Sequence, residues 1–173
     1  MKEDYNIITE DRLSFSFPHR VQATKYDDWS FYRNQFNAAF GGTKATDLIA
    51  IDGDTTWLVE IKDYRIHRRT KPIDLGDEVA VKIRDTLAGL TAAQCNANNK
   101  DEKQFARSAL KTKKLRIVLH LEQPLKHSRL FPRVINPVAV QQKIKQKLKA
   151  IDAHPKVVDQ HSLSPDMSWT VQG

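Results

Sequence analysis

The sequence predicts a protein of the α/β or α+β class, with a mixed central β-sheet flanked by helices. In some segments apolar residues alternate with polar ones, and in others they recur at spacings of three and four, and the two patterns interleave along the chain. Of the 173 residues, 40% are hydrophobic and 28% charged, which excludes disordered and fibrous proteins. The length is that of one domain, so we expect residues 1–173 to form a single domain.

The N-terminal part predicts one strand and one helix. Apolar and polar residues alternate over 13–17 and stop at Pro18, a pattern typical of a half-buried strand. From Asp28 to Phe40 the aromatic and alanine residues fall at helical spacing, and two glycines follow. We therefore expect an amphipathic helix over this segment, with Asp28 as its N-cap.

Two segments rich in Ile, Leu, Val, Thr and Trp come next, at 46–52 and 55–63. The residues between them, Gly53 and Asp54, have turn chemistry, so the pair predicts a β-hairpin.

The second half of the chain predicts helices and short strands after a basic loop at 65–72. We expect a long helix over 74–95 that packs on the sheet, a short helix over 105–111, a buried strand over 115–121, a helix from 136 to 151 and a last strand at 156–158.

Charge and cysteine content limit the cell compartment and the partners. The net charge of +7 is compatible with a polyanionic partner. No apolar run reaches the roughly 18 to 20 residues that cross a membrane, and the first eleven residues carry acids where a signal peptide is apolar. A single cysteine, Cys95, can form neither a disulfide within the chain nor a cysteine-rich zinc site. We expect a cytoplasmic protein that does not enter membranes.

The hairpin register brings two acids together. With a two-residue loop at 53–54, Asp52 pairs with Thr55 and Asp47 lies opposite Glu60. A four-residue loop keeps this pairing, whereas a three-residue loop breaks it unless a bulge restores it. Like charges at directly opposed positions destabilise a sheet, so this arrangement points to a function.

Lys62 lies on the same sheet face as these acids, because side chains alternate with period two. Mg²⁺ prefers oxygen ligands and takes one or two carboxylates together with phosphate oxygens. Asp47 and Glu60 could hold such an ion, while Lys62 orients or deprotonates a water molecule, or stabilises developing charge, during attack on a phosphodiester.

Thr46-Asp47 in one strand and Glu60-Ile61-Lys62 in the next resemble the active-site motif of the PD-(D/E)xK nuclease superfamily. The predicted order of helix, three-stranded meander, helix and strand over residues 28–121 is similar to the core of that family. The resemblance implies a restriction-endonuclease-like fold. The departure from the motif is Thr46, where the family name has proline.

The same resemblance implies roles for individual residues. Asp47 and Glu60 would bind metal, the main-chain carbonyl of Ile61 would add a ligand, and Lys62 would be the catalytic lysine. Members often contribute a further acid from the first helix. In this sequence Asp28 or Asp27 would be that acid, and Glu10 is a weaker candidate.

A basic loop follows the motif directly. Its members Tyr64, Arg65, Arg68, Arg69 and Lys71 could bind nucleic acid, the cations on phosphates and the tyrosine on a base. A solvated loop is the alternative. Glu78 and Lys82 could line the same cleft, or form an ordinary ion pair four residues apart on the next helix.

We therefore expect a metal-dependent nuclease that hydrolyses phosphodiester bonds with Asp47, Glu60 and Lys62 and uses Mg²⁺ or Mn²⁺. DNA rather than RNA as the substrate, and action as a homodimer, follow from the family alone, whereas a small single domain without a separate recognition module suggests structure-directed cutting or a protein partner. One alternative is a non-catalytic nucleic-acid-binding or assembly module on a nuclease-like fold. Another is an interaction protein whose charged hairpin is coincidental, which applies if Asp47 and Glu60 lie on opposite faces.

Overall fold

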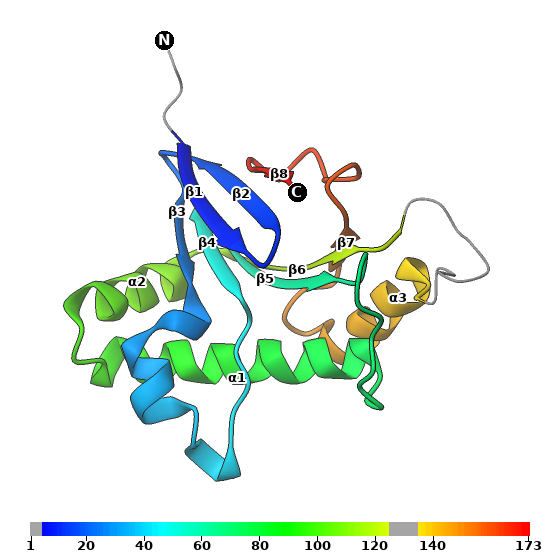
Figure 1. Cartoon of the computed structure of the whole chain (residues 1–173). Coiled ribbons are helices and arrows are strands. Elements are labelled where there is room, and N and C mark those ends of the chain that lie inside the picture. Colours follow the sequence, from blue (N-terminus) through cyan, green and yellow to red (C-terminus); the bar gives the residue numbers. More distant parts are fainter. Residues whose placement is uncertain (1–4, 125–134) are drawn as a thin grey trace.

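The computed structural model describes residues 5–124 and 135–173 as three layers (Figure 1). A central sheet has the strand order β3-β4-β5-β6-β7, and a smaller sheet has the order β1-β2-β8. In Figure 1, α1 runs along one side of the central sheet, and β1 and β2 lie on its other side. The central strands are β3 (Gln22–Lys25), β4 (Leu48–Asp52), β5 (Thr55–Asp63), β6 (Lys114–Glu122) and β7 (Lys156–Val158), the outer strands are β1 (Tyr5–Glu10), β2 (Leu13–Pro18) and β8 (Thr170–Gln172), and the helices are α1 (Leu75–Asn96), α2 (Lys100–Lys111) and α3 (Pro137–Leu148).

The central sheet is mixed, which confirms the predicted fold class. Strands β3, β4 and β5 pair antiparallel as a meander, whereas β6 and β7 are added in parallel. Parallel addition of β6 requires a crossover, and α1 and α2 supply it between β5 and β6.

Each face of the central sheet has its own hydrophobic core. Ile49 and Leu58 belong to the core beneath the helices, together with Val79 and Ile83 of α1. The alternate residues of β4 and β5 belong to the core under the small sheet, which contains Leu48, Ala50, Trp57, Val59 and Ile61 together with aromatic residues of β2 and the C-terminal segment. Strand β5 is therefore buried on both faces, so any charged side chain along it requires a partner.

Most predicted elements are confirmed. The alternation over 13–17 forms β2, whose apolar side chains are buried, and the hairpin, the long helix with Asp74 as N-cap, the buried strand, the helix capped by Asn136 and the strand at 156–158 are all present. The helix predicted at 105–111 begins earlier, at Lys100, because Asn99 caps it through bonds to the amides of residues 101 and 102.

The predicted helix over 28–40 is present only in part, over 30–36, and it is not a regular α-helix. The segment is split into η1 (Tyr26–Asp28), η2 (Tyr32–Phe36) and η3 (Ala39–Gly41). In η2 the amide of Asn37 donates to the carbonyl of Tyr32 over a wide turn, which brings the rings of Phe31 and Phe36 to a centroid distance of 6.1 Å. A regular helix would hold side chains five residues apart on different faces.

The cap of this segment also comes from elsewhere in the chain. Glu102 of α2 accepts hydrogen bonds from the amides of Ser30 and Phe31 at 2.7 and 3.0 Å, the role predicted for Asp28. Tertiary contacts, not local spacing, therefore set the backbone of this segment.

No helix in the two described ranges is long and apolar enough to cross a membrane.

Replacement of Gly89 by alanine should destabilise the fold. An added Cβ in this α1 position would lie 1.9 Å from the hydroxyl oxygen of Tyr26, which is itself buried against the rings of Trp29 and Tyr32. At an exposed helical site the change would stabilise by about 1 kcal/mol, but here overpacking should lower the free energy of unfolding by about 1 to 3 kcal/mol. Urea denaturation measures the difference.

Ala88→Ser, at the exposed neighbouring position, is the matched control and should change stability little. An equal or higher midpoint for Gly89→Ala would show that the Tyr26 ring moves aside without loss.

Candidate functional site

The predicted hairpin register is confirmed. Asp52 pairs with Thr55 across a two-residue loop, and Leu48 pairs with Val59. Gly53 in the loop has a φ of +55°, a left-handed conformation that glycine adopts readily. Asp47 directly precedes β4, and the same register places it opposite Glu60.

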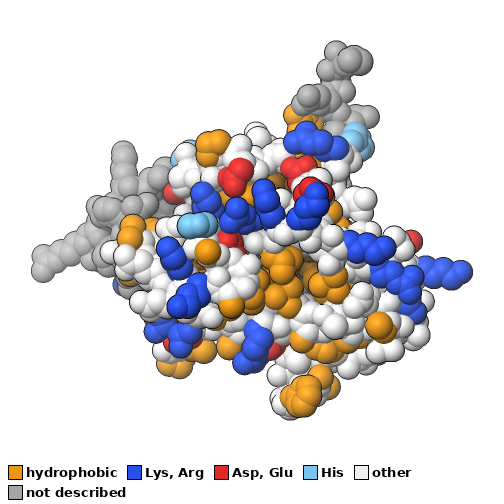
Figure 2. Space-filling model, turned by 180° about the vertical axis from the view of Figure 1, so that it is seen from behind, with side chains coloured by type: hydrophobic (Ala, Val, Ile, Leu, Met, Phe, Trp, Pro, Cys, Tyr) orange, Lys and Arg blue, Asp and Glu red, His pale blue; other side chains and the backbone are white. Residues whose placement is uncertain are grey.

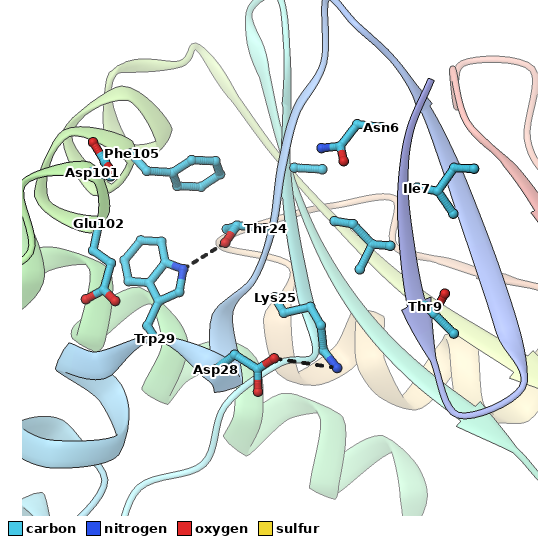
Figure 3. A pocket seen from close by; sticks show the side chains of 12 residues that line it. Asn6, Ile7, Thr9, Thr24, Lys25, Asp28, Trp29, Asp101, Glu102 and Phe105 are labelled. Carbon is cyan, nitrogen blue, oxygen red and sulfur yellow. Dashed lines mark hydrogen bonds and ion pairs between the residues drawn. The ribbon is translucent and has the colours of Figure 1, made fainter. Parts of the chain in front are cut away.

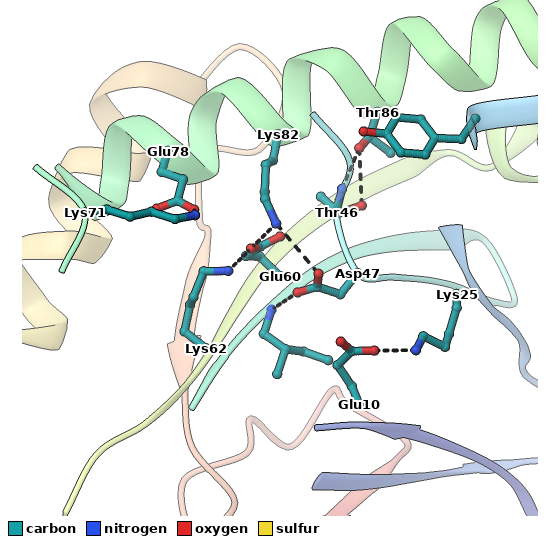
Figure 4. A network of polar contacts seen from close by, with 12 residues as sticks. Glu10, Lys25, Thr46, Asp47, Glu60, Lys62, Lys71, Glu78, Lys82 and Thr86 are labelled. Carbon is teal, nitrogen blue, oxygen red and sulfur yellow. Dashed lines mark hydrogen bonds and ion pairs between the residues drawn. The ribbon is translucent and has the colours of Figure 1, made fainter. Parts of the chain in front are cut away.

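The hairpin brings the two predicted acids and the lysine to one side of the sheet, facing α1 (Figure 4). Glu60 is fully buried and Asp47 nearly so. The Asp47 carboxylate accepts a hydrogen bond of 2.6 Å from the amide of Ile61, which fixes its position beside β5. Because both acids lie together, the alternative of a coincidental charged hairpin with its acids on opposite faces is not supported.

A second lysine, Lys82 of α1, completes the cluster. Lys62 and Lys82 each donate to Oε1 of Glu60 at 2.5 Å, and Nζ of Lys82 lies 3.7 Å from Oδ1 of Asp47 (Figure 4). Two ammonium groups thus face two carboxylates, which offsets the repulsion that the register creates.

The sequence gave Lys82 a different expected partner. The helical spacing predicts an ion pair with Glu78, but Glu78 binds Arg69 at 2.6 Å and Lys71 at 2.7 Å instead. A buried carboxylate such as Glu60 needs cations beside it, and this need was the only indication of its contact with Lys82. No local spacing in the sequence specifies which lysine meets it.

Burial and charge shift the pKa of both partners of the central ion pair. Burial, followed by the nearby Asp47 carboxylate, raises the pKa of Glu60 to about 7, although Lys82 and Lys62 oppose the shift. Burial by itself lowers the pKa of Lys62, but the carboxylates of Glu60 and Asp47 outweigh it and raise this pKa above its ordinary value. The lysine stays charged while Glu60 titrates close to neutral pH.

Further acids extend the site toward the small sheet. Carboxylate oxygens of Glu10, Asp27 and Asp47 lie within 4.8 Å of one another. Burial, with the charges of Asp47 and Glu10, raises the pKa of Asp27 to about 6. The additional acid expected at Asp28 instead forms ion pairs with Arg33 and, at 3.7 Å, with Lys25, which also binds Glu10 at 2.6 Å.

The donor set fits a hard divalent cation. Oδ1 of Asp27 and Oε2 of Glu60 are buried and have no hydrogen-bond partner among the described residues. A cation that prefers oxygen ligands, such as Mg²⁺ or Mn²⁺, would relieve the repulsion between these crowded carboxylates, two of which have raised pKa values.

The basic loop after β5 is held by ion pairs. Arg65 binds Asp63 and the carbonyl of Gly173, and Arg69 donates to the hydroxyl of Tyr64 as well as to Glu78. Arg68 and Lys71 are exposed. Lysine and arginine side chains also gather on the face of the molecule seen in Figure 2, with acidic side chains among them.

A comparison with known proteins finds a relative of a different kind from a nuclease. The chain is 37% identical to a cysteine–tRNA ligase of Neisseria meningitidis over an alignment of 155 residues, which covers 72% of this chain and 22% of the ligase. The chain thus spans about a fifth of the length of this relative. No family model and no solved structure gives a significant match.

The predicted nuclease and hydrolase function is overturned by this similarity, because the relative is named for the joining of cysteine to tRNA. The motif of Asp47, Glu60 and Lys62 is short and built from common residue types, so the same cluster can arise without strand cleavage. The relative is an enzyme that acts on a nucleic acid, as its name states, but that nucleic acid is an RNA. The DNA substrate and homodimer stay predictions.

Glu60→Gln should weaken the pH dependence of stability in metal-free buffer. The pKa of Glu60 rises from 4.5 to about 7 on folding, so the folded state binds more protons between these values and loses stability as pH increases through this window. From pH 5 to pH 8 the wild type should lose more free energy of unfolding than the variant, by a difference on the order of 3 kcal/mol. Urea denaturation at both pH values measures it.

Asp27, whose pKa shifts in the same direction, is present in both proteins, so its contribution to the pH dependence of stability cancels in the comparison. Asp54→Asn in the exposed hairpin turn is the control and should leave the pH profile unchanged. Identical profiles for Glu60→Gln and the wild type would show that Glu60 stays ionised throughout.

Proposed function

We propose that this chain is a tRNA-binding domain related to part of a cysteine–tRNA ligase. The similarity of 72% of the chain to such a ligase supports tRNA as the ligand. Because the match spans only 22% of the ligase, we assign the chain tRNA binding and not the complete joining of an amino acid to tRNA.

The charge of the molecule supports a nucleic-acid ligand. The chain has a net charge of +7, and affinity for a nucleic acid depends mainly on cations that replace its counterions. Arg68 and Lys71 are exposed on the basic loop, where they can contact a phosphate backbone.

We further propose that the acidic centre binds Mg²⁺ or Mn²⁺. Asp47 and Glu60, with Glu10 and Asp27 beside them and the carbonyl of Ile61 as a candidate ligand, would hold the ion. Such an ion supplies positive charge that contacts phosphate oxygens. The protein itself positions Asp47 through the amide of Ile61 and keeps Glu60 out of water.

The wild-type protein should bind tRNA more tightly than a DNA duplex with the same number of phosphates, by about tenfold or about 1.4 kcal/mol. A protein that recognises tRNA contacts its folded shape and its 2′-hydroxyl groups, which the duplex lacks. Fluorescence anisotropy at one fixed salt concentration measures both affinities.

A single-stranded DNA of the tRNA sequence serves as a second control for base composition. Equal or tighter binding of either DNA would contradict a tRNA-binding function.

Asp47→Asn should abolish saturable binding of Mn²⁺. The variant removes one negative charge, yet its side-chain oxygen can still accept the hydrogen bond from Ile61, so the fold should persist. Isothermal titration of Mn²⁺ into metal-free protein measures the effect.

Asp54→Asn removes one acid at an exposed site and should bind like the wild type. Retention of wild-type affinity by Asp47→Asn would exclude Asp47 as a ligand, and absence of any heat with the wild type would mean that the centre has no intrinsic affinity.

A further inference from the structure

A pocket of about 280 Å³ lies beside the acidic centre, and three lysines, one glutamate and two aliphatic residues line it. Three segments form it. The stretch before β4 contributes Lys44, the segment between β5 and α1 contributes Lys71 of the basic loop and Ile73, and α1 contributes Glu78, Val81 and Lys82. Drug-sized ligands usually occupy roughly 300 to 1,000 Å³, so this pocket fits a small group and not a whole nucleotide.

The electrostatics of this lysine pocket favour an anion. Three of its side chains carry ammonium groups, against the one carboxylate of Glu78. That carboxylate is already matched by Lys71 at 2.7 Å and by Arg69 at 2.6 Å, and these cations hold the pKa of Glu78 at about 2.

Of the three lysine ammonium groups, that of Lys44 has the fewest ion pairs and hydrogen bonds to described residues. Its main-chain amide is anchored to Asp85 of α1 by a hydrogen bond of 2.9 Å, which positions the residue at the pocket, while its side chain is exposed. Its ammonium group has neither an ion pair nor a hydrogen bond among residues 5–124 and 135–173.

Lys82 connects the lysine pocket with the acidic centre. Its stem lines the pocket, and its ammonium group contacts Glu60 at 2.5 Å (Figure 4). An anion in the pocket would therefore lie next to the carboxylates that we propose to bind a divalent cation.

We propose that the lysine pocket binds one phosphodiester group of an RNA strand, held by Lys44 and Lys71, with Lys82 at the inner end of the pocket. This inference rests on the proposed tRNA-binding function and names the site at which the RNA backbone is bound. Ile73 and Val81 offer apolar contact for the adjoining ribose. None of the described residues that line this pocket is aromatic, so it contacts the backbone and does not stack a base.

A second cavity is less suited to RNA. It is larger, about 670 Å³, and lies between β1, β3 and α2, where Trp29 and Phe105 face it (Figure 3). Its charged lining comprises Asp28, Asp101 and Glu102 against one lysine, so it repels phosphate.

The test measures tRNA affinity at several salt concentrations for the wild type, Lys44→Ala and Lys71→Ala. Each lysine that neutralises a phosphate contributes about 0.7 to 0.9 to the slope of log affinity against log salt. Each variant should therefore show a slope shallower by about one and weaker binding at low salt. Lys82 is left unchanged because its removal would leave Glu60 short of a cation.

Lys145→Ala on the exposed face of α3 is the matched control and should keep the wild-type slope. Lys44→Arg keeps the positive charge, so it should bind tRNA as tightly as the wild type does. Unchanged slopes in both alanine variants, with tRNA still bound, would overturn the pocket while leaving the proposed function in place.

Titration with inorganic phosphate, followed by amide NMR shifts, tests the pocket without tRNA. We expect shifts at Lys44, Ile73 and Val81 that are lost in Lys44→Ala. If phosphate causes these shifts but the protein does not bind tRNA, the proposed function is refuted and the anion site remains. If phosphate causes no shifts, the pocket is refuted as an anion site.

Discussion

The contact of Lys82 with Glu60 joins the helical layer to the central sheet. Glu60 lies in the middle of a strand that is buried on both faces, where an uncompensated carboxylate would be destabilising by several kcal/mol. Lys62 of the same strand supplies one cation, and the other comes from α1. The helix must therefore cross the sheet with Lys82 over Glu60, and this register also positions Glu78 to bind the loop that follows β5.

This constraint divides the site into two regions of opposite charge. Toward the small sheet, Glu10 and Asp27 join Asp47 in a crowded acidic group that Lys25 contacts through Glu10 and Lys82 through Asp47. Toward the basic loop, Lys44 and Lys71 form the lysine pocket with Lys82 at its inner end. A phosphate group with an associated divalent cation has the complementary distribution of charge, which connects the metal and RNA proposals in physical terms.

The same cluster is compatible with a chemistry that the similarity to a tRNA ligase overturns. Two acids and a lysine at the end of a hairpin are compatible with phosphodiester cleavage, and the geometry brings all three together as expected. Their proximity, however, follows from hairpin register and from ion pairing with Lys82, and neither requires catalysis. Similarity along most of the chain to a tRNA ligase carries more weight than a motif of three residues.

The sequence by itself determined the elements that depend on neighbouring residues. The turn at Gly53 fixed the hairpin register and thus the pairing of Asp47 with Glu60, while periodic apolar residues and the Asp74 cap fixed α1. Strand β1 escaped prediction because its side chains are mostly exposed and do not alternate clearly, and β3 and β8 because they are only four and three residues long; β3 and β8 pair with strands that lie far from them in the chain.

Only the tertiary structure decided the rest of the site. Glu102 caps the segment around Phe31 from α2, and the packing of its aromatic rings favours a wide turn over the regular helix that spacing predicts. Lys82 meets Glu60, and Glu10 meets Asp27 and Asp47, across separations that no local pattern encodes. The physical reason is common to these cases: a buried charge or an unpaired backbone group is satisfied by whichever partner the packed layers bring within reach.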